Sequence, residues 1–83
     1  MWPFKRRKRS KVIAKYRIVV DDWLYLTPNN SLSWGIDNAA EFDNIKEAYK
    51  AGVEIPHVNV QIIENKNGKV KFIHIEEVHK WGL

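Results

Sequence analysis

The chain has 83 residues, of which 45% are apolar and 12% aromatic, and it contains no cysteine. This length predicts one domain with a single core, and the lack of cysteine excludes disulfides and thiolate metal sites. No apolar run approaches the roughly 18 residues that a transmembrane helix needs, and no small-residue cleavage site follows the apolar stretch 11–20. We therefore expect a cytoplasmic protein.

The net charge of +4 is distributed unevenly along the chain. Residues 1–17 contain eight of the fourteen Lys and Arg residues and none of the ten Asp and Glu residues. Residues 18–83 therefore carry a net charge of −4. Attraction to polyanions is concentrated at the N-terminus. We divide the chain into a basic N-terminal arm, residues 1–11, and a single α+β domain, residues 12–83.

Alternating apolar residues predict a first strand over residues 12–20. Asp21-Asp22 is the expected turn, and residues 23–27 form the returning strand. Residues 28–31 end that strand, and residues 32–34 form a brief further extended piece. In the first strand, one face carries Val12, Ala14, Tyr16, Ile18 and Val20, and the other carries Ile13, Lys15, Arg17 and Val19.

A single helix is predicted over about residues 39–51. Apolar residues recur at helical spacing from Phe42 onward, and Gly52 follows as a residue that ends a helix. The start is ambiguous, because two segments have the spacing of a capping box. These segments are Asn38-x-x-Glu41 and Asn44-x-x-Glu47.

The last third of the chain predicts a hairpin. Asn67-Gly68 suits a type I′ turn because both residues tolerate positive φ. A two-residue loop fixes the register, which pairs Glu64 with Lys71, Ile62 with Ile73 and Val60 with Ile75. One face then carries Val58, Val60, Ile62, Ile73 and Ile75, and the other carries Asn59, Gln61, Ile63, Phe72, His74 and Glu76. One helix on the Val/Ile face gives the predicted fold, an α+β domain with a small antiparallel sheet of about four strands in the order ββαββ.

His74 and Glu76 share a face if this segment is a strand, and with His57 or His79 as a further ligand they could hold a metal. The spacing is not the His-Glu-x-x-His of a helical zinc site, and we interpret these residues as a solvated sheet face. Asp21-Asp22 suits a turn better than a general acid/base pair. The chain has no Gly-rich phosphate loop and no nucleophile signature. We therefore expect no metal, no cofactor, no small-molecule substrate and no enzymatic activity.

The aromatic residues of the domain have two interpretations. Phe72 and Tyr25 could form a platform on which bases stack, but a small domain also needs bulky side chains to fill its core, which we favour. Trp23, Trp34 and Trp81 are expected in the core or at its rim. An aromatic side chain left exposed would indicate a surface for a partner.

The basic residues at the N-terminus are the candidate phosphate contacts, because guanidinium and ammonium groups neutralise phosphates and release counterions. They are Lys5, Arg6, Arg7, Lys8, Arg9, Lys11, Lys15 and Arg17. Trp2 or Phe4 could stack on a base or wedge into a minor groove. The partner on this hypothesis is nucleic acid or a nucleoprotein complex.

Two alternatives remain for the same arm. Its cations could lie on an anionic membrane with Trp2 and Phe4 in the interface, which would make the protein a peripheral membrane adaptor. The arm could instead keep the protein soluble or dock on its own acidic domain.

The succession KYRIVV, WLYLTP, a lone Trp34, AAEFDNIKEAYKAG and a terminal hairpin resembles short accessory proteins of tailed bacteriophages, over most of residues 12–78. The resemblance implies a small α+β body that binds and redirects a host protein or nucleoprotein machine. Together with the basic arm, it leads us to expect a non-enzymatic binding module whose arm contacts phosphates and whose body contacts protein.

Overall fold

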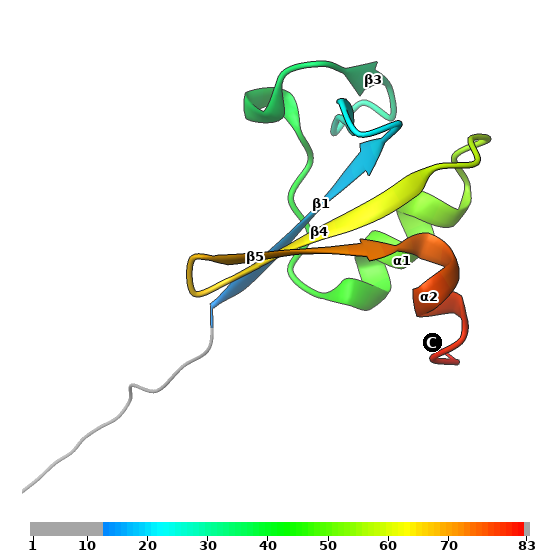
Figure 1. Cartoon of the computed structure of the whole chain (residues 1–83). Coiled ribbons are helices and arrows are strands. Elements are labelled where there is room, and N and C mark those ends of the chain that lie inside the picture. Colours follow the sequence, from blue (N-terminus) through cyan, green and yellow to red (C-terminus); the bar gives the residue numbers. More distant parts are fainter. Residues whose placement is uncertain (1–12, 83) are drawn as a thin grey trace, which may run out of the picture.

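The computed structural model describes residues 13–82. Five strands form one antiparallel sheet in the order β3-β2-β1-β4-β5 (Figure 1). The strands are β1 (Ala14–Val20), β2 (Leu24–Leu26), β3 (Leu32–Ser33), β4 (Val60–Lys66) and β5 (Lys69–His74). The helices are the short 3₁₀ helix η2 (Ile36–Asn38), α1 (Ile45–Val53) and α2 (Ile75–His79).

The predicted α+β class and antiparallel sheet are confirmed, but the predicted numbers of strands and helices are wrong. The sheet has five strands rather than about four, because the brief extended piece after the second strand pairs with β2 as β3. The domain has a second α-helix, α2, where the sequence pattern predicted a continuing strand.

Asp21 and Asp22 form the turn between β1 and β2, as predicted. Both residues have positive φ, 54° and 70°, a conformation that Asp adopts more readily than most other non-glycine residues. The Trp23 N–H donates to the Val20 carbonyl at 3.2 Å, and the Asp21 N–H donates to the Asn59 carbonyl at 2.9 Å. The turn is thereby held to the segment that leads into β4.

Helix α1 begins six residues later than predicted and ends two residues later. Of the two candidate capping boxes, the structure uses the second, because the Asn44 side chain accepts the Glu47 N–H at 2.9 Å. Asn38 of the first box ends η2, and the chain after it is extended. Phe42 pairs with Tyr16 of β1 through backbone hydrogen bonds of 2.8 and 3.0 Å. Pairing with the sheet takes the place of the additional helical turn.

The β4–β5 hairpin has the predicted turn, with φ of 54° at Asn67 and 86° at Gly68. The predicted pairs Glu64 with Lys71 and Ile62 with Ile73 are confirmed. The third pair, Val60 with Ile75, is wrong, because β5 ends at His74. The His74 Nδ1 accepts the Glu76 N–H at 3.2 Å and so caps the start of α2.

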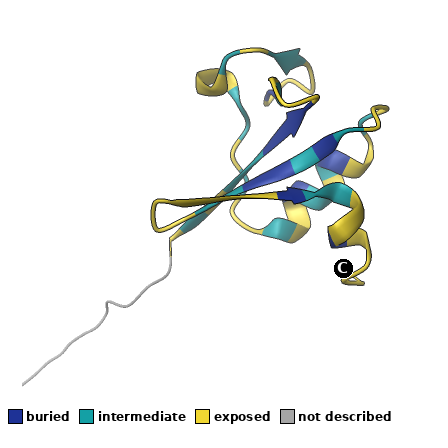
Figure 2. Cartoon of the chain, in the orientation of Figure 1, coloured by how far each residue is buried: buried dark blue, intermediate teal, exposed yellow. Residues whose placement is uncertain are grey.

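The core lies between the two α-helices and one face of the sheet (Figures 1 and 2). Val58 was predicted to join this face but is 90% exposed, because it precedes β4. Gly52 was predicted to follow the helix but lies within it, where a Cβ would be 2.8 Å from Ile75 Cδ1. The buried core residues are Ile18, Val20, Leu26, Ala48, Val60, Ile62, Ile73 and Val78.

Neither α-helix covers the opposite side of the sheet, which we call the open face. Val19 and Ile63 are buried near its centre, whereas Phe72 at its edge is 58% exposed. The expectation that Phe72 fills the core is therefore wrong. The strand register places Lys15, Arg17, Val19, Tyr25, Gln61, Ile63, Asn65, Val70, Phe72 and His74 on this face.

Candidate functional site

Two of the predicted phosphate contacts, Lys15 and Arg17, lie on the open face of β1. The Lys15 Nζ is 2.7 Å from Asp43 Oδ1, and the Arg17 guanidinium pairs with the Glu41 carboxylate. Glu41 and Asp43 flank Phe42, so the backbone bridge from Phe42 to β1 places both carboxylates beside the two cations. Each cation thus already has a carboxylate partner in the same chain.

The two ion pairs differ in their exposure. The side chains of Lys15 and Asp43 are 45% and 85% exposed. The hydrogen bond from Lys15, and then its charge, lower the pKa of Asp43, and the same hydrogen bond and charge from Asp43 raise the pKa of Lys15. Because water screens an exposed pair, its net contribution to stability is small. A phosphate can therefore compete with Asp43 for the Lys15 ammonium group.

Arg17 is less accessible, since its side chain is 24% exposed. It lines a hollow of about 510 Å³ together with the carboxylates of Asp37 and Glu41. The Arg17 Nε has no hydrogen-bond partner within residues 13–82. Two carboxylates on the wall of this hollow oppose the entry of a second anion, so Arg17 is a weaker candidate for a phosphate contact than Lys15.

The β4–β5 hairpin adds three lysines that the sequence reasoning did not select: Lys66, Lys69 and Lys71. All three are exposed, and within residues 13–82 none of them forms an ion pair with a carboxylate. The turn between them lies beside the start of β1 (Figure 1). The Asn67 N–H donates to the Ile13 carbonyl at 2.9 Å, and the Ile13 N–H donates to the Asn67 side chain at 3.2 Å. We call these three lysines the cationic end of the sheet.

The basic arm is joined to the domain at this cationic end, because it precedes Ile13 in the sequence. The remaining predicted site residues lie outside the described residues. They are Trp2, Phe4, Lys5, Arg6, Arg7, Lys8, Arg9 and Lys11. The six cations of residues 5–11 thus precede, in the sequence, a strand whose start lies beside the cationic end.

The sequence contained part of the signal for this arrangement. The predicted Asn67-Gly68 turn already placed Lys66 and Lys69 on either side of a hairpin tip. The missing step was the antiparallel pairing of β1 with β4, which sets Ala14 opposite Lys66. No local pattern specifies that long-range pairing.

Glu64 is the acidic residue on β4 that lies opposite Lys71. No ion pair joins the two side chains within the described residues, although the register sets their opposite charges across from each other. Glu64 instead influences the ionisation of Tyr16, its cross-strand partner on β1. Burial, followed by the charge and hydrogen bonding of Glu64, raises the pKa of Tyr16.

The histidines at the C-terminal end have structural contacts. His74 caps α2, and the Nδ1 of His79 is 2.7 Å from the Tyr49 hydroxyl of α1. His74 and Glu76 do not share a face of one strand, because the segment from Ile75 to His79 is helical. Across residues 13–82, no three His, Asp or Glu side chains are grouped as metal ligands.

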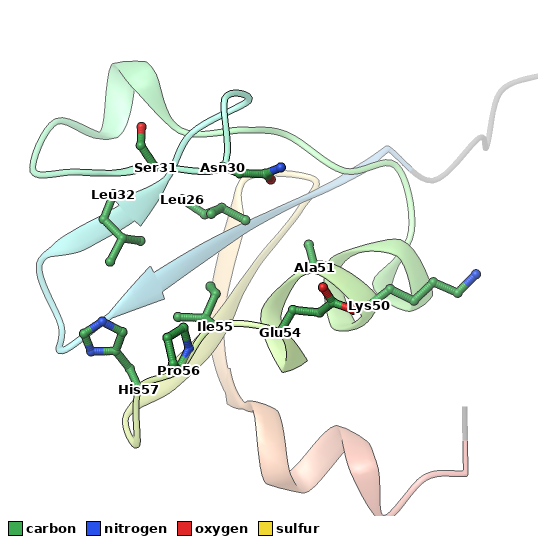
Figure 3. A pocket seen from close by; sticks show the side chains of 10 residues that line it. All are labelled: Leu26, Asn30, Ser31, Leu32, Lys50, Ala51, Glu54, Ile55, Pro56 and His57. Carbon is green, nitrogen blue, oxygen red and sulfur yellow. The ribbon is translucent and has the colours of Figure 1, made fainter.

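A pocket of about 460 Å³ lies between the β2–β3 hairpin on one side and the last part of α1 with the segment that follows it on the other (Figure 3). His57 stands at one side of it, with its Nδ1 3.7 Å from Asp21 Oδ2. The Ser31 hydroxyl is 2.8 Å from the Thr27 hydroxyl, so the hydroxyl that lines the pocket is bonded within its own hairpin. The other lining residues are Leu26, Asn30, Leu32, Lys50, Ala51, Glu54, Ile55 and Pro56.

The tryptophans of the domain are more exposed than expected. Trp23, Trp34 and Trp81 are 58%, 78% and 51% exposed, so none of them belongs to the core. Tyr25 is half-buried on the open face. The exposure of the three tryptophans leaves these large aromatic side chains accessible on the surface of the described domain.

Comparisons of the chain with protein-family models, with curated proteins and with solved structures found no match. Among the described helices, none has the length and apolar character required to cross a membrane.

Proposed function

We propose that the chain is a non-enzymatic, cytoplasmic binding module that engages nucleic acid or a nucleoprotein complex. In this proposal the basic arm contacts phosphates and the α+β body contacts protein. The observation that carries the proposal is the cationic end, because Lys66, Lys69 and Lys71 extend the charge of the arm onto the folded domain. By resemblance in element order, we further propose that the protein acts as a phage-type accessory factor on a host complex.

The charge segregation supports phosphate binding quantitatively. Each phosphate that the protein neutralises on duplex DNA changes the slope of log K against log salt by about −0.9. The six cations of residues 5–11 would give a slope of about −5, and the three lysines of the cationic end would bring it to about −8. Lys15 adds to the magnitude of this slope only when a phosphate displaces the Asp43 carboxylate.

The proposal is tested by fluorescence anisotropy with a labelled duplex and a labelled single strand over a series of salt concentrations. Changing the six cations of residues 5–11 to Gln should reduce the magnitude of the duplex slope by about 5. Changing the three lysines of the cationic end to Gln should reduce it by about 3. A matched control removes the same charge elsewhere, at Lys46, Lys50 and Lys80, and should leave the slope nearly unchanged.

A salt slope near zero for the full chain, or equal effects of the cationic-end and control variants, would refute the proposal. Flotation with anionic vesicles separates it from the membrane alternative. If the full chain floats with vesicles, loses flotation in the arm variant and shows no salt-sensitive binding to either nucleic acid, the peripheral membrane adaptor replaces the nucleic-acid module.

A further inference from the structure

Strand β5 forms an edge of the sheet with an unpaired outer side. It is the last strand in the order β3-β2-β1-β4-β5, and its register with β4 is continuous from Lys69 to His74. In an antiparallel hairpin closed by a two-residue loop, alternate residues bond to the partner strand, beginning with the residue after the loop. The backbone groups of Val70 and Phe72 therefore point outward, and within residues 13–82 no other backbone pairs with them.

The side chains of β5 alternate in chemical character across the two faces. Val70 and Phe72 are 56% and 58% exposed on the open face. Lys69 and Lys71 are exposed on the other face. The tip of this hairpin is exposed and extends past the helices (Figure 2). A strand added to this edge would meet apolar side chains on one face and unpaired ammonium groups on the other.

We propose that β5 binds an extended segment of a partner protein as a sixth strand, and that this segment alternates acidic and apolar residues. The proposal names the protein-contacting surface of the body, and in this respect it rests on the proposed function. Strand addition supplies main-chain hydrogen bonds, and the alternating side chains supply specificity. Carboxylates of the partner would face Lys69 and Lys71, and its apolar side chains would lie beside Val70 and Phe72.

The positive charges of Lys69 and Lys71 favour an acidic partner segment over the other molecules that could bind the free edge of β5. A second copy of the chain pairing through its own β5 would bring lysines against lysines, which opposes self-association. Nucleic acid has no peptide backbone to continue the ladder. The opposite edge of the sheet, β3, has only two residues and offers a much shorter ladder.

The test uses the full chain and two labelled peptides of identical composition. The first peptide alternates valine and glutamate, and the second carries the same residues in two blocks. Both have the same charge, so attraction to the basic arm is equal for the two. The alternating peptide should bind about tenfold more tightly by anisotropy, and it should slow hydrogen exchange of the Val70 and Phe72 amides. Equal affinities, or unchanged exchange at both amides, would overturn the proposal.

Two variants distinguish the contribution of backbone hydrogen bonds from that of charge in binding of the alternating peptide. Val70→Pro removes an outward N–H while it keeps the bonds to β4, a placement that edge strands tolerate, and it should weaken the alternating peptide about tenfold. Lys69→Glu should weaken that peptide about fivefold. Lys66→Glu makes the same charge change on β4, opposite Lys69 and one strand in from the edge, so it does not adjoin the added strand and serves as the matched control. Circular dichroism verifies that each variant is folded.

The same variants distinguish a failure of peptide binding at β5 from a failure of nucleic-acid binding. Lys69→Glu and Lys66→Glu should weaken nucleic-acid binding alike, because both only change charge at the hairpin tip, and Val70→Pro should leave it unchanged. If nucleic-acid binding follows this pattern but all variants bind the alternating peptide equally, the edge proposal is wrong and the proposed function stands. If the peptide pattern holds without nucleic-acid binding, the phosphate contact is wrong and the edge proposal stands.

Discussion

Gly52 gives the sharpest test of how the helices pack. In an exposed helix, Gly→Ala stabilises by about 1 kcal/mol because Ala restricts the unfolded chain and favours helix. At this position a Cβ would lie 2.8 Å from Ile75 Cδ1, 3.5 Å from Ile18 Cδ1 and 3.6 Å from Val60 Cγ1. The first distance is a clash with α2, and the other two are ordinary contacts. The relevant perturbation is therefore Gly52→Ala, alone and with Ile75→Val.

The expected changes in the free energy of unfolding follow from these distances. Overpacking of a core costs about 1–3 kcal/mol, which exceeds the helix-propensity gain, so Gly52→Ala should destabilise by about 1 kcal/mol. Ile75→Val removes the clashing methyl group and should cost about 1 kcal/mol by itself. In the double variant the Ala methyl occupies the vacated space, so stability should return to within about 0.5 kcal/mol of the parent chain.

Urea denaturation followed by far-UV circular dichroism measures the free energy of unfolding of the parent chain, of both single variants and of the double variant. The expected coupling energy is about 1–2 kcal/mol in favour of the double variant. Additive effects, or a Gly52→Ala variant more stable than the parent chain, would show that α1 and α2 do not meet as closely as described.

Three further predictions concern the start of α1 and the exposed ion pair. Asn44→Ala should lower the free energy of unfolding by about 1 kcal/mol because it removes the helix cap, whereas Asn38→Ala should change it much less; equal effects in chemical denaturation would contradict the cap assignment. Because Lys15 holds the pKa of Asp43 below its ordinary value of 3.8, the pair stabilises the fold above that value, and the contribution is lost as pH falls through the folded pKa. A carboxyl NMR titration in which Lys15→Gln leaves the Asp43 pKa unmoved would disprove this contact. Asp43→Asn should increase duplex affinity, since it frees the Lys15 ammonium, and it should steepen the salt slope by about 1; an unchanged slope in the anisotropy assay would exclude Lys15 from the phosphate contacts.

The sequence specified local features better than the pairings between them. Asn67-Gly68 determined a turn and two cross-strand pairs because its backbone preferences are local. The start of α1 was ambiguous because Asn38 and Asn44 both suit a cap, and the choice depends on the pairing of Phe42 with β1. Helix α2 was missed because five residues carry too little periodicity, and its start depends on the His74 cap.

The candidate site likewise combines features that the sequence specifies locally with features that depend on long-range pairing. The charged residues of the arm are evident in the sequence, whereas the cationic end depends on which strand lies beside the hairpin. The carboxylate partners of Lys15 and Arg17 come from a segment about 25 residues further along the chain. Their positions follow from the backbone bridge to β1, which the alternation of apolar residues does not encode.

The place of β1 in the middle of the sheet has a mechanical consequence. The strand that continues from the arm is held by β4 along its whole length and by β2 and Phe42 on its other side. A pull along the axis of β1 would load both sets of bonds in shear, and they would have to break together for the strand to leave the sheet. Tension applied at the start of β1 would thus be borne by both neighbouring strands and by the Phe42 bridge.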